Sequence, residues 1–246
     1  MNPRHDFRVV SFNVEGARWG GGRAAWLRRL PHVVARIRRC LDDSTPANPS
    51  IILATECGVM EAADLRKALG AGWKSTTFLY STILYKGWTI GKRWVKTWNK
   101  GTHGAVIAEL KRDGLTVNAV CSHLPPFVWR AKMRKRCIAQ LASFLKGWKD
   151  PIVIGGDFNW RSSLESYAAM LGFKSARLTA MTKVNAGYRT NLGWGMGSAI
   201  DYILTRGLTV RGYVVMRRWN PVTHSTASDH HMVTVQASIP VTVNAA

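Results

Sequence analysis

The sequence predicts an α/β protein in which two packed, mixed β-sheets are flanked by helices. Many short apolar runs have the length of strands, a few longer segments have helical periodicity, and the turn Arg112-Asp113-Gly114 favours an antiparallel hairpin. The chain has 246 residues, 46% of them hydrophobic and 20% charged, and no proline- or glycine-rich linker divides it. We therefore expect a single domain over residues 1–246.

The apolar runs define the expected strands. They are Phe7–Asn13, Ser50–Thr55, Thr76–Tyr85, Arg93–Thr97, Gly104–Leu110, Leu115–Ser122, Ile152–Gly155, Ala199–Thr205, Val210–Met216 and His231–Ala237. Helical spacing of apolar residues predicts helices over Ala24–Leu41, Glu61–Leu69 and Trp129–Leu145. Pro31 lies inside the first helix and is expected to kink or restart it, whereas Gly70 favours the end of the second.

Net charge is the most unusual property of the composition. Lys and Arg number 35 against 14 Asp and Glu, which gives +21 with neutral histidines. This excess favours an anionic partner. Nucleic acid is the first candidate, because Lys and Arg neutralise its phosphates, and an anionic membrane surface is the second. The alternative is that the charge serves solubility alone.

The sequence contains no signal-peptide pattern, and no apolar stretch approaches the 18 residues of a membrane span. We therefore expect a cytoplasmic protein without stable membrane insertion, and nothing implies an obligate protein partner. Cys40, Cys57, Cys121 and Cys137 are widely spaced and form no Cys-x-x-Cys pair. They are expected to be buried, reduced thiols, with a zinc site as the less favoured alternative.

Five of the acidic residues lie at the end of an apolar strand or within one: Glu15, Glu56, Asp157, Asp201 and Asp229. A buried carboxylate is costly unless it is paired or bound to a cation. Oxygen ligands with few imidazoles and no thiolates favour Mg²⁺ or Mn²⁺ over zinc. For each acid alone, a structural role in a loop or a hydrogen bond to the backbone is the alternative.

Amide and imidazole side chains stand at strand ends as well: Asn13, Asn159, His123 and His230. These groups bind phosphate oxygens or transfer protons. A basic protein with an acidic, metal-binding pocket suits phosphodiester hydrolysis, because the basic surface holds the polyanion and the cation stabilises charge at the scissile phosphate.

Six segments resemble motifs of the endonuclease/exonuclease/phosphatase superfamily, in the order of that family. They are Ser11–Gly16, Ile51–Glu56, Cys121–Pro125, Gly155–Asn159, Ile200–Ile203 and Ser228–His230. The superfamily includes deoxyribonuclease I-like and exonuclease III-like nucleases, phosphoinositide phosphatases and neutral sphingomyelinases. The resemblance implies a four-layer α/β sandwich and a metal-dependent hydrolase. It also implies that Glu56 is the main metal ligand and that Asn13, Glu15 and Asp229 complete or support the cation site.

The same resemblance implies roles in catalysis. Asp157 is expected to orient and deprotonate the attacking water, and Asn159 to hold that water or a phosphate oxygen. Asp201 is expected to orient His230, which contacts the phosphate or transfers a proton. His123 is expected near the leaving oxygen. Deoxyribonuclease I-like members pair this histidine with a carboxylate, but the matching stretch 78–83 has no acid, so a phosphate-binding or structural role for His123 is equally open.

A second departure from the family is Thr55-Glu56-Cys57, where Gln-Glu-Thr or Gln-Glu-Lys is common, so hydrogen bonding around Glu56 must differ. Arginine and tryptophan in two glycine-rich loops favour nucleic acid as substrate, because they can enter a groove or stack on bases. The expected contacts are Arg18, Trp19, Arg23, Arg161, Arg189 and Trp194. Core packing is the alternative for the tryptophans.

The sequence therefore predicts a nuclease that hydrolyses DNA, or RNA, with Mg²⁺ or Mn²⁺. One alternative is a phosphoinositide phosphatase or sphingomyelinase-type enzyme, whose basic face would meet anionic lipid. The other is a catalytically silent nucleic-acid-binding protein, although every expected catalytic position is filled. Strand preference and the choice between endonuclease and exonuclease action are left open.

Overall fold

The computed structural model describes most of the chain. The described residues are 6–18, 21–41, 49–98, 103–126, 131–160, 164–175, 200–216, 219–220, 225–226, 228 and 230–240. Within them, the strands form two six-stranded sheets and one short ribbon.

One sheet has the strand order β11 (Thr209–Met216), β14 (Met232–Ser238), β1 (Asp6–Asn13), β2 (Ser50–Thr55), β4 (Ser81–Lys86) and β3 (Lys74–Phe78). The other has the order β5 (Thr89–Trp98), β6 (His103–Arg112), β7 (Leu115–His123), β8 (Ile152–Asp157), β10 (Asp201–Arg206) and β9 (Lys174–Ser175). The ribbon pairs β12 (Trp219–Asn220) with β13 (Ser225–Thr226). Because β1–β2 and β7–β8 are parallel and the remaining pairs antiparallel, both six-stranded sheets are mixed, as predicted.

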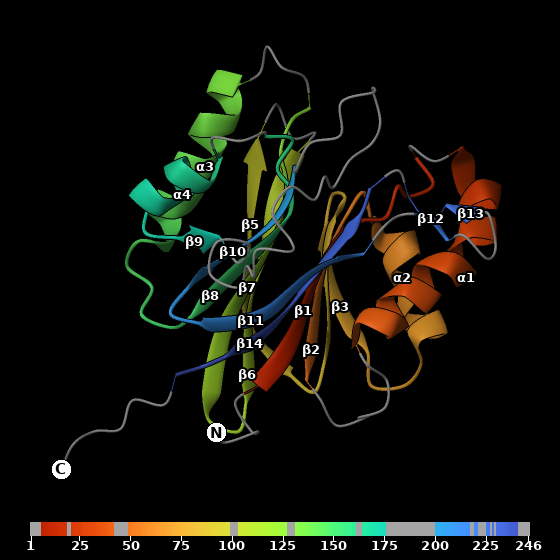
Figure 1. The fold of residues 1–246 in the computed structure, drawn as a ribbon, viewed down its shortest axis with the longest axis horizontal. Coiled ribbons are helices and arrows are strands. Elements are labelled where there is room, and N and C mark those ends of the chain that lie inside the picture. The colour runs from red at the N-terminus through yellow and green to blue at the C-terminus, as the bar shows by residue number, and fades with distance from the viewer. Residues whose placement is uncertain are drawn as a thin grey trace.

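Helices cover the outer face of each sheet (Figure 1). On the first sheet lie α1 (Gly22–Leu41) and α2 (Val59–Leu69), and on the second lie α3 (Ala131–Leu145) and α4 (Leu164–Met170). A third apolar cluster fills the space between the two sheets, with residues from β1, β2 and β4 facing residues from β6, β7 and β8. The predicted four-layer sandwich is therefore confirmed. None of the described helices is long and apolar enough to cross a membrane.

Most element predictions hold, and two are wrong. The expected strand Thr76–Tyr85 is two strands, because Leu79 takes a positive φ of 53° and the chain turns back on itself. Pro31 does not break α1, which continues for 20 residues. Burial of Trp26, Val33 and Ile37 along one face of α1 outweighs the hydrogen bond that the proline removes. The short elements α4, β9, β12 and β13 were not predicted, since they are too short to show periodicity.

The four cysteines are buried and free of disulfides, as expected. Burial raises the pKa of each thiol above its ordinary value of 9.0, so these residues favour the unreactive protonated form.

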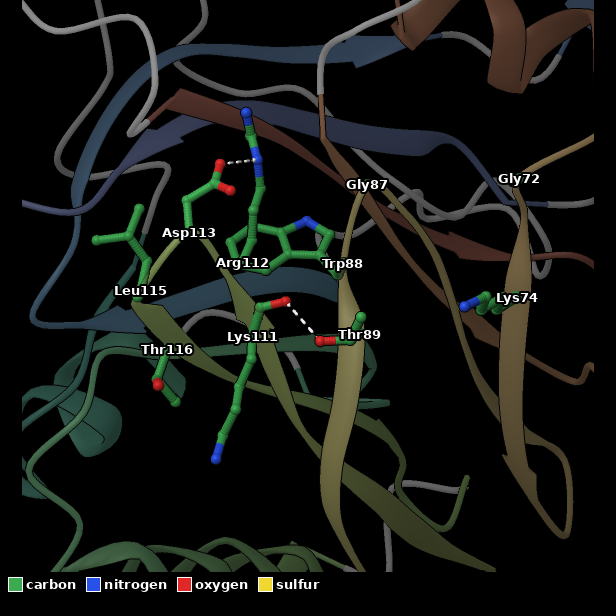
Figure 2. Close-up of a pocket in the computed structure, with 11 residues that line it drawn as sticks. Gly72, Lys74, Gly87, Trp88, Thr89, Lys111, Arg112, Asp113, Leu115 and Thr116 are labelled. Atoms are coloured by element: carbon green, nitrogen blue, oxygen red, sulfur yellow. Dashed lines mark hydrogen bonds and ion pairs between the residues drawn. The ribbon is translucent and has the colours of Figure 1, made fainter.

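The parallel pairs give the sandwich two chemically different edges. We call the edge where β1, β2, β7 and β8 end the carboxyl edge, and the edge where they begin the amino edge. At the amino edge, tight turns surround a cavity of about 760 Å³ (Figure 2). The lining includes Lys74, Lys111 and Arg112 beside Trp88. Lys111 lies 2.9 Å from Glu109 and Arg112 bonds to Asp113, so two of the three cations are paired within the protein.

Candidate active site

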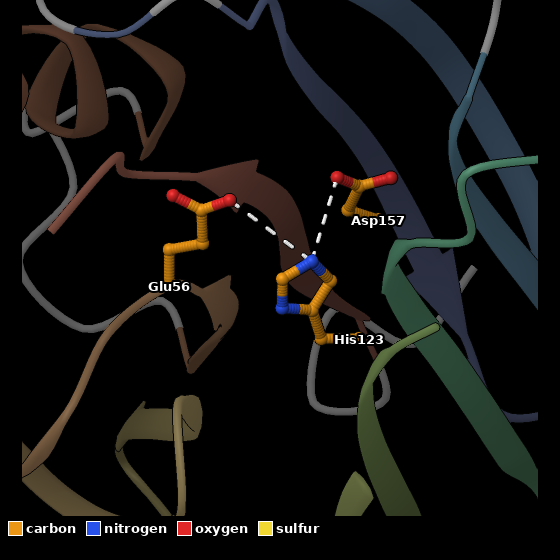
Figure 3. A group of neighbouring side chains, drawn as sticks. All are labelled: Glu56, His123 and Asp157. Atoms are coloured by element: carbon orange, nitrogen blue, oxygen red, sulfur yellow. Dashed lines mark ion pairs between the residues drawn. The ribbon is translucent and has the colours of Figure 1, made fainter. Parts of the chain in front are cut away.

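Three titratable side chains meet at the carboxyl edge, each from a different strand end. Glu56 follows β2, His123 ends β7 and Asp157 ends β8 (Figure 3). The Nε2 atom of His123 lies 4.0 Å from Oε1 of Glu56 and 3.8 Å from Oδ2 of Asp157. One ligand atom from each residue lies within 4.8 Å of the others, which is close enough to share a metal ion.

Asp157 also belongs to a second group with Asp201 and His230. The Nδ1 atom of His230 lies 2.7 Å from Oδ2 of Asp201, and its Nε2 atom lies 3.7 Å from Oδ2 of Asp157. Because Asp201 begins β10 directly opposite Asp157 on β8, the antiparallel register sets this arrangement. A carboxylate on Nδ1 fixes the tautomer and orientation of the imidazole, which leaves Nε2 facing the site.

Asn13, the last residue of β1, joins the two groups. Its Nδ2 amide lies 3.0 Å from Oε1 of Glu56, 3.2 Å from Oδ2 of Asp157 and 3.4 Å from Nε2 of His230. Its Oδ1 atom accepts the N–H of Glu15 at 3.0 Å. The amide therefore offers donors to the carboxylates and orients them, while its oxygen is used by the local backbone.

Strained backbone marks the carboxyl edge. Glu15, Glu56 and Asn159 have positive φ values of 48°, 54° and 49°, each just after the end of β1, β2 or β8. Such conformations cost residues other than glycine of order 1–3 kcal/mol and occur where the surroundings fix them. Gly16 permits one such fixing contact, because a Cβ there would overlap the carbonyl oxygen of Glu56.

Burial changes the protonation of the site. Asp157 is 2% exposed, and burial, with a further contribution from Asp201, raises its pKa to about 7 despite the opposing effect of His230. Burial, with His103 and His230, lowers the pKa of His123 to about 3, so this imidazole is neutral. Without a cation, Asp157 is therefore protonated below about pH 7.

A divalent cation fits this donor set. The carboxylates of Glu56 and Asp157 supply hard oxygen ligands, and a cation between them would offset the cost of burying two negative charges. These two acids, with His123, are the residues that would hold it. Within the described residues, neither group includes a cysteine.

The structure does not bring every predicted residue into the cluster. The carboxylate of Glu15 turns away and lies 3.3 Å from Arg29, which also bonds to the backbone of this loop. The Nδ2 amide of Asn159 donates to the carbonyl of Leu124 at 3.0 Å, and its backbone N–H donates to Asp157 at 2.8 Å. Asn159 therefore fixes Asp157 and the loop after β7 directly.

The predicted nucleic-acid contacts fall into two sets. Arg18 is exposed in the loop after β1, where its guanidinium bonds to the hydroxyl of Tyr80 and lies 5.0 Å from the centre of that ring. Arg23 makes a two-pronged ion pair with Asp64, which also accepts the indole N–H of Trp26. The other predicted contacts lie outside the described residues: Trp19, Arg161, Arg189 and Trp194. The predicted metal residue Asp229 also lies outside them.

Sequence reasoning assigned no role to three residues of the site, of which only Ser228 lay in one of the recognised motifs. His103 packs edge to face on His123, with ring centres 5.2 Å apart. Ser228 donates to the carbonyl of Asn13 at 2.6 Å and accepts the N–H of His230 at 3.1 Å. Glu61, which resembles an ordinary surface acid in the sequence, is buried. Its only sequence signal is the capping pattern from Gly58 to Glu61.

Comparisons with known proteins bear on the family and on the fold. The model of the Endonuclease/Exonuclease/phosphatase family matches residues 10–230. A comparison with curated proteins found no match.

Solved structures with the same fold include an endonuclease/exonuclease/phosphatase from Bacteroides vulgatus, with a TM-score of 0.76 and 17% identity over 96% of this chain and 99% of that chain. D. rerio TDP2 complexed with a single-strand DNA product has a TM-score of 0.73 and 13% identity over 95% of this chain and 99% of that chain. The mannosyl-6-phosphatase Bt3783 of Bacteroides thetaiotaomicron has a TM-score of 0.71 and 18% identity over 95% of this chain and 100% of that chain. At these identities the likeness shows the fold alone.

Proposed function

The chain belongs to the endonuclease/exonuclease/phosphatase family of phosphoester hydrolases, and on that premise we propose that it is a Mg²⁺- or Mn²⁺-dependent nuclease that hydrolyses DNA. RNA is the alternative polymer. The proposal goes beyond the family, because similar structures include both a TDP2 complexed with single-strand DNA product and a mannosyl-6-phosphatase.

The distribution of acidic residues carries the proposal. Asp6, Asp113 and Asp150 are partly or fully exposed, and all three stand at the amino edge, where β1, β7 and β8 begin. At the carboxyl edge, the described acids outside the catalytic cluster are held by other groups. Glu15 and Asp64 are paired with arginines, and Glu61 accepts backbone hydrogen bonds. Among the described residues outside the catalytic cluster, little unpaired negative charge therefore opposes a polyanion at this edge.

Exposed cations lie on both outer layers, on elements that follow strands ending at the carboxyl edge. The first turns of α3, which follows β7, carry the exposed side chains of Lys132, Lys135 and Arg136. On the other layer, exposed Arg18 and Arg28 lie in the loop after β1 and in the first half of α1. A polymer with many phosphates can reach both sets, whereas a single phosphate group cannot. This favours nucleic acid over a small phosphate ester.

The proposal gives each side chain of the cluster a distinct role. A divalent cation, when bound, would stabilise the charge that develops on the phosphate oxygens. Asp157 is positioned to orient a water and to take its proton, with Asn159 and Asn13 holding the carboxylate. His230, fixed by Asp201, presents Nε2 to a phosphate oxygen or to a transferred proton. His123, neutral beside Glu56, would contact the phosphate near the leaving oxygen.

Cleavage of supercoiled plasmid DNA with and without Mg²⁺ tests the proposal. We expect nicked or linear products with Mg²⁺ or Mn²⁺ and none in EDTA, because the ligands are hard oxygens. Parallel assays use single-stranded RNA, p-nitrophenyl phosphate and vesicles that contain phosphoinositide or sphingomyelin. Turnover of the monoester or of the lipids without cleavage of either nucleic acid would contradict the proposal, as would full DNA cleavage in EDTA.

A further inference from the structure

Glu61 is a buried carboxylate beside the catalytic cluster but outside it. It lies in the first turn of α2 and is 6% exposed. Its Oε1 atom accepts the N–H of Ala17, and its Oε2 atom accepts the N–H of Gly58, both at 3.1 Å. Ala17 belongs to the loop after β1, and Gly58 to the loop after β2. One side chain therefore connects the loop after β1 with the loop after β2, which contains Glu56.

The backbone around Glu56 is held at successive positions. The carbonyl of Glu56 accepts the N–H of Gly16 at 3.1 Å. Cys57 donates its N–H to the carbonyl of Tyr80 at 3.1 Å and accepts the hydroxyl of Thr82 at 2.7 Å. The next N–H, of Gly58, is the one that Glu61 binds. These contacts keep Glu56 in its left-handed conformation, with φ of 54°.

We propose that Glu61 is a positioning residue that holds the Glu56 carboxylate in place for a divalent cation. It acts on both sides of Glu56: directly on the loop after β2 and, through Ala17, on the loop whose Gly16 N–H binds the Glu56 carbonyl. Groups that orient a metal ligand typically change metal affinity about 10- to 100-fold when they are replaced. The proposal rests on the metal-dependent part of the proposed function and not on nucleic acid as substrate.

Glu61→Gln is the first test, because glutamine keeps the size of the side chain but exchanges one acceptor oxygen for an NH₂ donor. One of the two loop contacts is then lost. Calorimetric titration with Mn²⁺ alone, without substrate, should show a dissociation constant raised by about 10-fold or more relative to wild type. All proteins are compared at a temperature where circular dichroism shows them folded.

Asp64→Asn is the matched control. Asp64 lies in the same helix and, like Glu61, accepts hydrogen bonds from two residues. Its donors are the side chains of Arg23 and Trp26 on α1, whereas those of Glu61 are backbone N–H groups of the loops around Glu56. We expect Mn²⁺ affinity to be unchanged in this variant, although it too loses helix contacts. An equal loss in both variants, or wild-type affinity in Glu61→Gln, would overturn the proposal.

A double mutant separates positioning from general damage to the fold. If Glu61 acts through Glu56, then Glu61→Gln should have little further effect on the Mn²⁺ affinity that remains in Glu56→Gln. Additive losses would show that Glu61 does not act through this ligand. Mn²⁺ binding that follows these expectations in a protein unable to cut DNA would refute the nuclease and leave the role of Glu61 standing.

Discussion

At the amino edge, the turns place positive φ values on glycines, 73° at Gly87, 76° at Gly114 and 70° at Gly207, and on the exposed Asp113, 49°. At the carboxyl edge, positive φ values fall not only on glycines such as Gly156 but also on three residues of the site loops: Glu15, Glu56 and Asn159. Glycine adopts this conformation at no steric cost, whereas the other residues are strained. Among the described residues, strain therefore falls on one exposed turn aspartate at the amino edge and on three residues beside the catalytic cluster at the carboxyl edge, where side chains must be aimed.

The exposure of carboxylates also differs between the two edges. Asp113 and Asp150 at the amino edge are exposed to solvent. Asp157 and Asp201 at the carboxyl edge are 2% and 1% exposed. Burying two neighbouring acids lowers the stability of the folded state, because desolvation penalises their charged forms. The difference indicates that the carboxyl edge is arranged for chemistry.

Asp157→Asn should have the largest effect. Turnover on plasmid DNA should fall by about 10²- to 10⁴-fold, the usual contribution of a positioned proton-transfer group. DNA binding should persist, because the basic residues are unchanged. Steady-state cleavage and filter binding measure the two properties. Asp113→Asn at the amino edge is the control and should cleave like wild type. A residual rate in Asp157→Asn above a tenth of wild type would exclude Asp157 as the group that activates water.

The second largest effect should distinguish His230 from His123 at the carboxyl edge. His230 has a carboxylate on Nδ1, whereas His123 packs against His103 and stays neutral. We therefore expect His230→Ala to lower kcat more than His123→Ala by at least about tenfold. Rates at saturating DNA and Mg²⁺ provide the comparison. Equal losses would mean that His123 transfers a proton in spite of its lowered pKa.

Stability should depend on pH through Asp157. Its pKa is raised from 3.8 to about 7, so folding favours the protonated form. That contribution is complete below the ordinary pKa and is lost as the pH rises through about 7. In EDTA, the Tm of wild type should therefore fall relative to that of Asp157→Asn between pH 5 and pH 8.

Two comparisons isolate this effect. His123, whose pKa is lowered, contributes the opposite slope, but it is present in both proteins and cancels in the difference. Adding Mn²⁺ should shrink the difference at high pH, because a cation stabilises the ionised carboxylate. A difference in Tm that does not change with pH would show that Asp157 is ionised throughout.

Much of this edge could be predicted from the sequence, because its chemistry follows strand ends. Asn13, Glu56, His123 and Asp157 each come at the end of an apolar run or just after it, and parallel strands bring such ends together. That these four residues cluster could therefore be predicted from the pattern of apolar runs and the order of the motifs alone.

Other contacts depend on packing that no local pattern contains. Glu15 shares its motif with Asn13, yet its positive φ turns its carboxylate to Arg29, a partner on α1. His103 reaches His123 only because β6 and β7 form a hairpin in which Gly104 pairs with His123. The burial of Glu61 depends on two loops that come from different strands. Such contacts link distant segments, so sequence periodicity does not indicate them.

The smallest expected effect separates Arg18 from Arg23. Both were predicted to bind phosphates, but Asp64 already offsets the charge of Arg23, whereas Arg18 lies exposed against Tyr80. The affinity for duplex DNA should fall with salt with a log–log slope of about −0.9 per phosphate neutralised. Arg18→Ala should flatten the slope by up to about one unit, the value for one lost phosphate contact, and Arg23→Ala by less.

Lys111→Ala at the amino edge should leave the slope unchanged. Salt titrations in the Asp157→Asn background avoid cleavage, and an equal change in all three variants would mean that the charge acts from the whole surface rather than from the carboxyl edge.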